Sequence, residues 1–225
     1  MILLAAILGV SCAAEAPTYV MEQTERYTES IQLPDPATVG SVPLETAFSE
    51  RRSARDYSSE PLPIETIGQL FWAGQGITDD AGHRTAPSAG ALYPLELYAI
   101  TTEAVMHYLP ASHRVEQRPD STTLAQLTAA AFDQAFVGAA PTVLVITGTE
   151  SRTEAKYGAV AADLVNRESG HAAQNILLQA TALGLAAVPV GGFDPAAIER
   201  LLALSPGEQV LYLIPIGYPT VAADG

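Results

Sequence analysis

The sequence predicts a layered α+β domain, and three stretches carry that prediction. Alternating apolar and polar residues over Leu95–Ile100, followed closely by Val105–Leu109, predict two strands that pair locally. Thr142–Thr147 is apolar on both faces, which is typical of a strand buried inside a sheet. Glu154–Leu183 contains no proline and predicts a long helical region before the last strands. Early strands that pair locally and later strands separated by helices favour α+β layers over a doubly wound sheet.

The remaining elements follow from helical spacing, alternation and capping residues. Pro63 opens one helix, Ser121 and Asp194-Pro195 suit helix N-termini, and Gly184 is a stop. The long region contains Gly158 and Gly170, so we expect either two helices or one kinked helix there. We therefore predict helices over Leu44–Arg51, Ile64–Ala73, Ser121–Phe136 and Ala196–Leu204, and strands over Ala187–Val190 and Gln209–Ile216.

Composition limits the class of protein. The 225 residues are 48% hydrophobic and 16% charged, which suits one domain with a large core. The formal net charge of −14 argues against nucleic acid as a partner, because phosphate backbones require a basic face. One Cys and four scattered His form no zinc-binding spacing, so we expect no metal site.

The N-terminus differs from the rest of the chain. Met1–Val10 is almost wholly apolar and fits the hydrophobic part of a secretory signal, although no positive charge precedes it. Small residues before Cys12 suggest a lipoprotein signal with a lipid anchor on Cys12, whereas Ala14–Ala16 suggests ordinary signal cleavage. We expect a signal over 1–16, an extended arm over 17–42 and the main domain over 43–225. Export to the periplasm or a membrane anchor follows from this interpretation, and a cytoplasmic protein is the alternative.

Basic residues are concentrated in the segment from Arg51 to Arg55. Three of the 11 Lys and Arg residues lie within these five positions of an acidic chain. If the segment is extended, Arg51, Ser53 and Arg55 share one face, and their guanidinium and hydroxyl groups suit a phosphate. The alternative is a basic helix end that pairs with surface carboxylates.

Two turns are made of small residues. Pro87, Ser88, Ala89 and Gly90 form a turn whose backbone is able to approach a flat ligand, or else a plain helix entry with Ser88 as N-cap. Val190, Gly191 and Gly192 end a strand before the capped helix. That junction presents backbone N–H groups at a helix N-terminus, and a tight structural turn would look the same.

Four segments in order resemble the nitroreductase superfamily of flavin enzymes, and within it the SagB-type branch of thiazoline/oxazoline dehydrogenases. The resemblance extends from about Leu44 to Pro219. It implies the nitroreductase fold, with a central, mostly antiparallel sheet flanked by long helices, and FMN bound at the interface of a homodimer. The segments are Glu50–Arg55, Arg84–Pro94, Lys156–Gly158 together with Glu168–Asn175, and Ala182–Asp194.

The resemblance also implies roles for the cofactor-binding residues. Arg51, Arg52 and Ser53 would hold the FMN phosphate, and Arg55 would reach the pyrimidine edge of the ring. The Pro87–Gly90 turn would lie against the isoalloxazine, in part from the partner subunit, and the Val190–Gly192 amides would adjust its chemistry. Many nitroreductases carry a Glu at the position of Gly191, and its absence resembles the SagB-type branch.

Lys156 and Tyr157 are the predicted catalytic pair, because the resemblance places a catalytic Lys-Tyr at this position. Azoline oxidation removes a hydride and a proton from neighbouring carbons. A desolvated Lys is able to take the proton while Tyr orients or relays it. Lys is rare in this sequence. The alternative is a surface Lys beside a core Tyr.

We therefore predict an FMN-dependent oxidoreductase that takes a hydride from a small heterocyclic or peptide substrate. The alternatives are an NAD(P)H-dependent nitro- or quinone reductase and a non-catalytic envelope lipoprotein with a degenerate flavin site. The resemblance implies a late phosphate-binding cation, but no Lys or Arg follows Arg200, so Arg84 of the partner is a possible substitute. We expect His171, Gln174 and Asn175 to share a structural helix face, and Phe71 and Trp72 to be core.

Overall fold

The computed structural model describes residues 26–220, so the predicted signal over 1–16, with Cys12, lies outside the described residues. A seven-stranded, fully antiparallel sheet forms the centre, in the order β1-β4-β3-β2-β5-β7-β6. The strands are β1 Glu29–Gln32, β2 Leu95–Thr101, β3 Ala104–Leu109, β4 Arg114–Pro119, β5 Thr142–Thr149, β6 Ala186–Ala187 and β7 Glu208–Gly217. The helices are α2 Leu44–Glu50, α3 Ile64–Gln75, α4 Thr123–Ala130, α5 Ala135–Ala139, α6 Ser151–Tyr157, α7 Ala161–Ala182 and α8 Pro195–Leu202.

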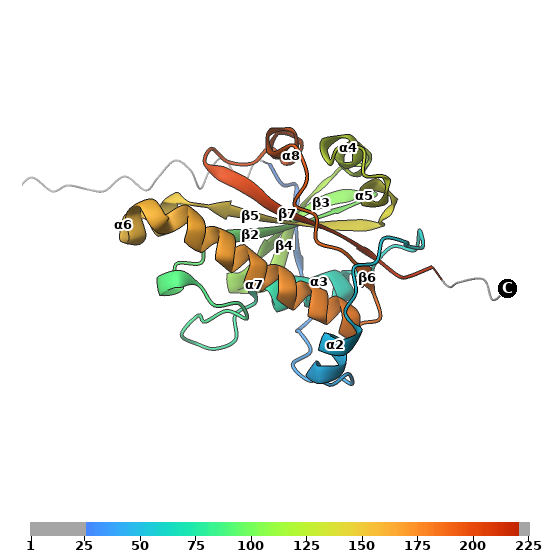
Figure 1. The fold of residues 1–225 in the computed structure, drawn as a ribbon, viewed down its shortest axis with the longest axis horizontal. Helices are drawn as coiled ribbons and strands as arrows, with labels where there is room; N and C mark the ends of the chain where they lie inside the picture. Colours follow the sequence, from blue (N-terminus) through green and yellow to red (C-terminus); the bar gives the residue numbers. More distant parts are fainter. Residues whose placement is uncertain (1–25, 221–225) are drawn as a thin grey trace, which may run out of the picture.

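Helices cover both faces of the sheet, as Figure 1 shows. Helices α3 and α7 pack on one face, while α4, α5 and α8 lie on the other. Central strand β5 serves both layers: Leu144 and Ile146 enter the α3/α7 core, and Val143 and Val145 enter the opposite core. This two-sided burial is why the β5 sequence is apolar on both faces, and it confirms the predicted α+β class.

β1 and β4, at one edge of the sheet, were not predicted from the sequence. β1 lies within the expected arm over 17–42 and pairs with β4, which in turn pairs with β3. Both carry polar residues and are largely half-buried or exposed, so their hydrophobic pattern is weak. Leu33, just after β1, is nevertheless in the main core at 2% exposure.

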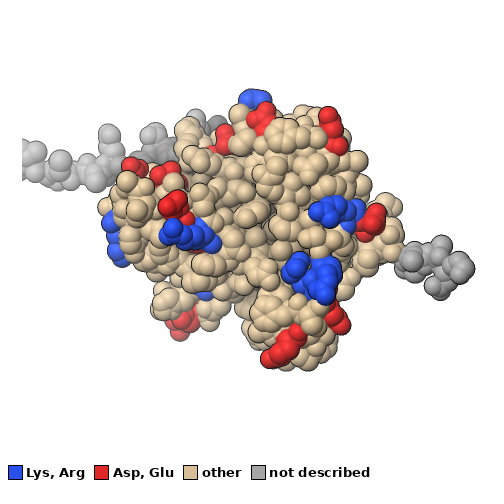
Figure 2. All heavy atoms as spheres, in the orientation of Figure 1, with Lys and Arg blue, Asp and Glu red and all other residues tan. Residues whose placement is uncertain are grey.

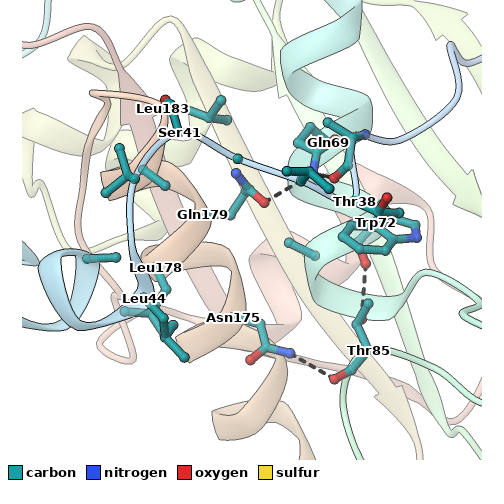
Figure 3. A pocket seen from close by; sticks show the side chains of 17 residues that line it. Thr38, Ser41, Leu44, Gln69, Trp72, Thr85, Asn175, Leu178, Gln179 and Leu183 are labelled. Atoms are coloured by element: carbon teal, nitrogen blue, oxygen red, sulfur yellow. Dashed lines mark hydrogen bonds between the residues drawn. The ribbon is translucent and has the colours of Figure 1, made fainter.

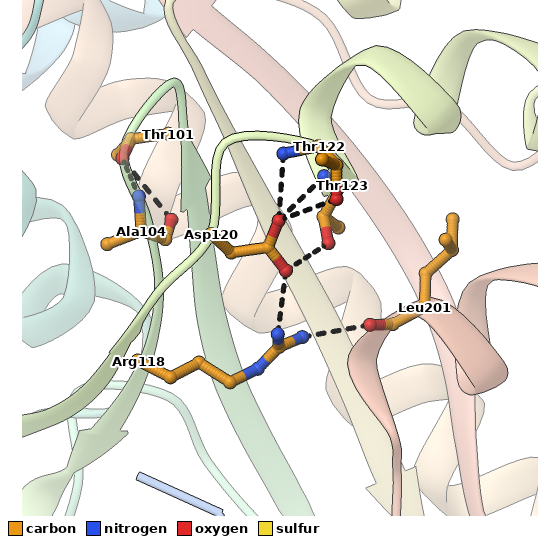
Figure 4. Close-up of polar contacts among 7 residues, drawn as sticks. All are labelled: Thr101, Ala104, Arg118, Asp120, Thr122, Thr123 and Leu201. Atoms are coloured by element: carbon orange, nitrogen blue, oxygen red, sulfur yellow. Dashed lines mark hydrogen bonds and ion pairs between the residues drawn. The ribbon is translucent and has the colours of Figure 1, made fainter. Parts of the chain in front are cut away.

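The predicted helix over Ser121–Phe136 is two short helices. Phe132 and Asp133 adopt positive φ angles of 54° and 57°, which end α4 before α5 begins. The predicted cap is also wrong: Thr122, not Ser121, occupies the N-cap position. The Asp120 carboxylate accepts from the backbone N–H groups of Thr122 and Thr123 at 2.9 Å each. Figure 4 shows that Asp120 also binds Arg118, which donates to the Leu201 carbonyl.

The long helical region breaks at Gly158 and not at Gly170. Gly158 has φ +56°, and it separates α6 from the 22-residue α7. Gly184 ends α7 as predicted: its φ is +71°, and the N–H of Leu185 donates to the Ala180 carbonyl at 2.8 Å. α7 thus runs unbroken across one face of the sheet.

Among residues 26–220, no helix has the length and apolar character needed to span a bilayer.

The predicted strand over Ala187–Val190 is shorter in the structure. Only Ala186–Ala187 belongs to β6, and Val190 makes a separate bridge to Leu213.

Candidate active site

The Arg51–Arg55 segment leaves α2 and runs beside β6. Ser53 forms a parallel bridge with Ala187, and the Ala54 N–H donates to the Ala187 carbonyl at 3.1 Å. The segment is therefore extended, which is the condition under which Arg51, Ser53 and Arg55 share one face. It lies next to the strand end that leads to Gly191. We call Arg51, Ser53, Arg55 and the Val190–Gly192 junction the basic half-site.

The guanidinium groups of this segment make no ion pair with any carboxylate of residues 26–220. The alternative of a basic helix end bound to surface carboxylates therefore has no support among these residues. Arg55 lies 5.2 Å from the centroid of the Phe136 ring. Figure 2 shows basic side chains gathered where α2 and the segment after it lie in Figure 1.

Arg52 makes a different contact from its neighbours. Its guanidinium donates to the carbonyls of Ser49 and Arg51 at 2.9 and 2.8 Å. These carbonyls belong to the C-terminal end of α2, where a cation also opposes the helix dipole. Arg52 therefore has a structural task at the helix end, and its predicted contact with a phosphate stays a prediction.

Gln134, which was not predicted as a site residue, binds the backbone of the glycine junction. The Gln134 amide donates to the Gly192 carbonyl at 2.7 Å and to the Ala131 carbonyl at 2.8 Å. A Cβ added to Gly191 would have no neighbour within 4 Å. Asp194 then caps α8 by accepting from the Ala197 N–H at 3.2 Å, as predicted. The backbone at Gly191 is accessible at the start of a capped helix.

A second group of predicted residues gathers at α6. Gly90 has φ +64°, and a Cβ added to it would lie 2.7 Å from Lys156 Nζ and 2.9 Å from the Tyr157 hydroxyl. The turn that was predicted to face a ring therefore touches the predicted catalytic pair. We call Ser88–Gly90, Lys156 and Tyr157 the lysine half-site.

Lys156 is the single lysine of the whole sequence. It lies in the last turn of α6, is exposed in the single chain, and has its Nζ 5.5 Å from the Tyr157 ring centroid. Ser88 occupies the predicted N-cap position of a short 3-10 turn over Ala89–Ala91 but makes no side-chain cap bond to it. Its hydroxyl oxygen accepts from the Tyr93 N–H at 2.9 Å instead.

A buried polar cluster lies behind the Ser88 turn. Arg84 donates to Gln75 Oε1 at 2.7 Å, and its guanidinium lies 4.6 Å from the Tyr93 ring centroid. Glu168 on α7 is 3% exposed. Burial raises the pKa of Glu168 to about 7, although the Ser88 hydroxyl and the Arg84 charge oppose that shift. Burial also lowers the pKa of Arg84.

The two half-sites lie at opposite ends of α7. α2, which leads into the basic half-site, packs beside Leu178 and Gln179 near the end of α7, while Tyr157 precedes its start. A helix of 22 residues is roughly 33 Å long. The separation along this helix is therefore large, and the structure does not bring Arg51 and Lys156 together within one chain.

A cavity of about 520 Å³ lies between residues 37–42, α2, α3 and α7. Figure 3 shows Trp72, Gln69 and Gln179 at this cavity, with Asn175 donating to the Thr85 carbonyl at 3.1 Å. Phe71 is core, as predicted, but Trp72 is only half-buried and lines the cavity. His171 and Gln174 are exposed on α7.

Comparison with known proteins assigns the family. The family model "Nitroreductase family" matches residues 48–218. A Methanocaldococcus jannaschii protein named "Putative nitroreductase MJ1384" is 39% identical over 196 residues, covering 84% of this chain and 96% of the relative. The chain belongs to the nitroreductase family, and it is an oxidoreductase of the α+β class.

Solved structures agree on the fold. A Ralstonia eutropha crystal structure of "a putative nitroreductase" has a TM-score of 0.76 at 27% identity, covering 86% of this chain and 91% of that chain. The NADPH:FMN oxidoreductase from Vibrio harveyi, complexed with NAD+, has a TM-score of 0.60 at 24% identity, covering 79% and 69%. The second likeness shows the fold alone.

The residues present fit the flavin that this family generally uses. Within residues 26–220, Arg51 and Arg55 offer guanidinium groups that make no ion pair, and the Gly191 backbone is open. These features suit a phosphate and the polar edge of a ring. Residues 26–220 contain no group of three or more His, Cys, Asp or Glu residues placed to hold a metal ion.

Proposed function

We propose that the protein is an FMN-dependent oxidoreductase whose flavin site is shared between two copies of the chain. The observation that carries this proposal is the contact of Gly90 with Lys156 and Tyr157 at one end of α7. Arg51 and Arg55, which make no ion pair among residues 26–220, lie toward the other end. A two-fold dimer would bring the basic half-site of one subunit to the lysine half-site of its partner.

The exposed apolar residues support such a dimer. Leu44 and Phe48 are 57% and 56% exposed, and they lie four residues apart on the same face of α2. α2 buries only Ala47 among its own residues, so most of its surface has no cover within the chain. Exposed apolar residues gathered on one helix are typical of an interface.

Within this site each half would have its own task. Arg51 and Ser53 would bind the flavin phosphate, Arg55 would reach the ring edge, and the Gly191 and Gly192 N–H groups would face developing negative charge on the ring. Bound FMN supplies a hydride acceptor. The Pro87–Gly90 turn would close the ring face from the partner side.

Lys156 and Tyr157 would handle the proton. We propose a SagB-like reaction in which a substrate C–H bond gives a hydride to flavin and the neighbouring atom gives its proton to Lys156, leaving a double bond in the substrate. Tyr157 would orient or relay that proton. Lys156 is exposed in the single chain, so cover by the partner subunit would provide the desolvation that favours a neutral amine. Oxygen or a quinone would take the electrons.

An NAD(P)H-dependent nitro- or quinone reductase is the second candidate. The name of the Methanocaldococcus protein, "Putative nitroreductase MJ1384", favours this reductase. Lys156 and the Gly at position 191, which stands where many nitroreductases carry Glu, favour the SagB-like reaction instead. The third candidate is a non-catalytic envelope protein with a degenerate flavin site. It would be favoured if the purified chain bound no flavin.

Export and a lipid anchor at Cys12 are also proposals. Mass spectrometry of the native protein would test them.

The test begins with the visible spectrum of the purified full chain after incubation with FMN. Bound flavin absorbance is the expected result, and a colourless protein would contradict both enzyme proposals. Rapid anaerobic bleaching by NADPH would then favour the reductase. If the dehydrogenase proposal holds, Lys156→Ala abolishes azoline oxidation while FMN stays bound. An unchanged rate in that variant would remove Lys156 from the mechanism.

A further inference from the structure

Helix α6, which carries Lys156 and Tyr157, has few apolar contacts to hold it in place. It contains only seven residues, and Thr153 is the one residue of this helix that is buried. A helix of two turns is not stable by itself in water, so its position depends on the contacts that it makes with the rest of the chain. The position of the Lys156 amine therefore depends on whatever anchors α6.

An ion pair ties the first turn of α6 to the central sheet. Arg152 Nη1 lies 2.5 Å from Oε1 of Glu96, a residue of β2. The Glu96 side chain is 18% exposed and the Arg152 side chain is 37% exposed, so solvent screens this pair less than a fully exposed pair. Arg152 precedes Lys156 by four residues, which places the two on the same face of α6.

A buried histidine fixes the orientation of Glu96 from the other side. His107 Nε2 lies 3.1 Å from Glu96 Oε2, so each oxygen of the carboxylate has its own partner. The His107 ring stacks on the Tyr98 ring with their centroids 4.7 Å apart, and the His107 side chain is 5% exposed. Because packing within the sheet holds His107, the carboxylate that receives Arg152 has little freedom to move.

The chain segment that leads into Glu96 also carries the turn that Lys156 contacts. Gly90 lies in this turn, and a Cβ added to it would lie 2.7 Å from Lys156 Nζ. Between the turn and Glu96, the Pro94 carbonyl accepts from the Thr149 N–H at 2.9 Å, which joins the start of β2 to the end of β5 just before α6 begins. The start of β2 and the turn before it therefore contact α6 at both of its ends.

We propose that Arg152 is a positioning residue whose ion pair with Glu96 holds α6 on the sheet and so keeps Lys156 within the lysine half-site. The inference rests on the proposed function for its catalytic meaning, because Lys156 is the proposed base. The contacts themselves belong to the chain and do not require flavin. Loss of the ion pair leaves the first turn of α6 poorly anchored and releases Lys156 from the Gly90 turn.

Because Lys156 is the only lysine, two measurements on the full chain report on it alone. NMR of the chain grown with isotopically labelled lysine gives one set of side-chain signals. The Tyr157 ring, whose centroid is 5.5 Å from Nζ, displaces these signals from those of free lysine. Acylation with acetic anhydride, followed by mass spectrometry of the peptide that contains Lys156, measures the reactivity of the amine. Arg152→Gln should move the NMR signals toward those of free lysine and raise the acylation rate about threefold.

A double-mutant cycle and a matched control separate the ion pair from general destabilisation. Glu96→Gln should change both Lys156 readouts in the same direction. The double variant should show no larger change than the greater of the two single variants, because both substitutions remove one interaction. Arg167 is the matched control, since it pairs with Asp163 on α7 at 3.7 Å, also four residues away. Arg167→Gln should leave the Lys156 signals and acylation rate unchanged.

Circular dichroism verifies that every variant is folded. Unchanged Lys156 signals in Arg152→Gln, or effects of the Arg152 and Glu96 substitutions that simply add, would overturn the inference. The flavin absorbance of the same samples reports separately on the proposed function, and Arg152→Gln should keep FMN bound.

Discussion

Gly90 and Lys156 lie so close that a Cβ on Gly90 would be 2.7 Å from the lysine Nζ. Gly90 also has a φ of +64°, which glycine adopts without strain. The position therefore has two separate reasons to be glycine: backbone conformation and room for the amine of the only lysine in the chain.

Gly90→Ala should lower the free energy of unfolding by about 1 kcal/mol through left-handed strain, and should also displace Lys156. Gly82→Ala is the matched control, because Gly82 has φ +82° but a Cβ there would have no neighbour within 4 Å. Urea unfolding should give similar losses for the two variants, while Lys156 acylation should change only in Gly90→Ala. Equal acylation in both would show that the Gly90–Lys156 contact has no consequence for the amine.

Arg51→Ala and Arg52→Ala should separate the two tasks of the basic segment. Loss of a charge-assisted contact to phosphate costs about 1.5–3 kcal/mol, so Arg51→Ala should weaken FMN binding roughly 10- to 100-fold. Arg52 binds the last carbonyls of α2, so Arg52→Ala should instead lower the unfolding free energy by about 0.5 kcal/mol. Flavin fluorescence titration measures the affinities, and equal losses in both variants would mean that Arg52 also holds the phosphate.

Stability should fall as pH rises through the range in which His107 titrates. Burial alone would lower the pKa of His107, but interactions with Glu116 and Glu96 outweigh it and raise the pKa to about 9. Nε2 lies 3.1 Å from Glu96 and Nδ1 lies 3.9 Å from Glu116, the second being an ion-pair distance too long for a hydrogen bond.

The sign follows from the raised pKa. Because the folded state holds the proton more tightly than the unfolded chain, the stabilisation is complete below about pH 6.5 and is lost as pH rises through about 9. Urea unfolding at about pH 6 and about pH 9.5 should show this loss, and His107→Gln should flatten the difference. A wild-type protein equally stable at both values would be inconsistent with a charged His107.

Much of the fold was predictable because most elements carry a strong local pattern. β5 is apolar on both faces because two cores meet there, and Asp194-Pro195 begins α8 as expected. The polar strands β1 and β4 carry no such pattern. The break between α4 and α5 depends on tertiary contacts, since the Asp194 N–H donates to the Ala130 carbonyl at 2.7 Å, and no local rule places that contact.

The sequence predicted individual residues of the candidate site, but it did not predict how they are arranged in space. Arg51, Gly90 and Lys156 each stand in a recognisable motif, yet only the path of α7 shows that they form two separated groups. No motif identified Gln134 as a site residue, because its contact with the site comes from a partner far away in the sequence. Its amide donates to the Gly192 carbonyl.

If one flavin site is built from two subunits, mixing subunits that carry different defects should restore it. Arg51→Ala damages the basic half-site, and Gly90→Phe would block the lysine half-site. Each homodimer should therefore lose FMN. Random mixing by co-expression should restore about one quarter of the wild-type flavin per subunit, because half the dimers are mixed and each of these has one intact site. No recovery of flavin absorbance on mixing, or a wild-type monomer that retains FMN, would contradict the shared site.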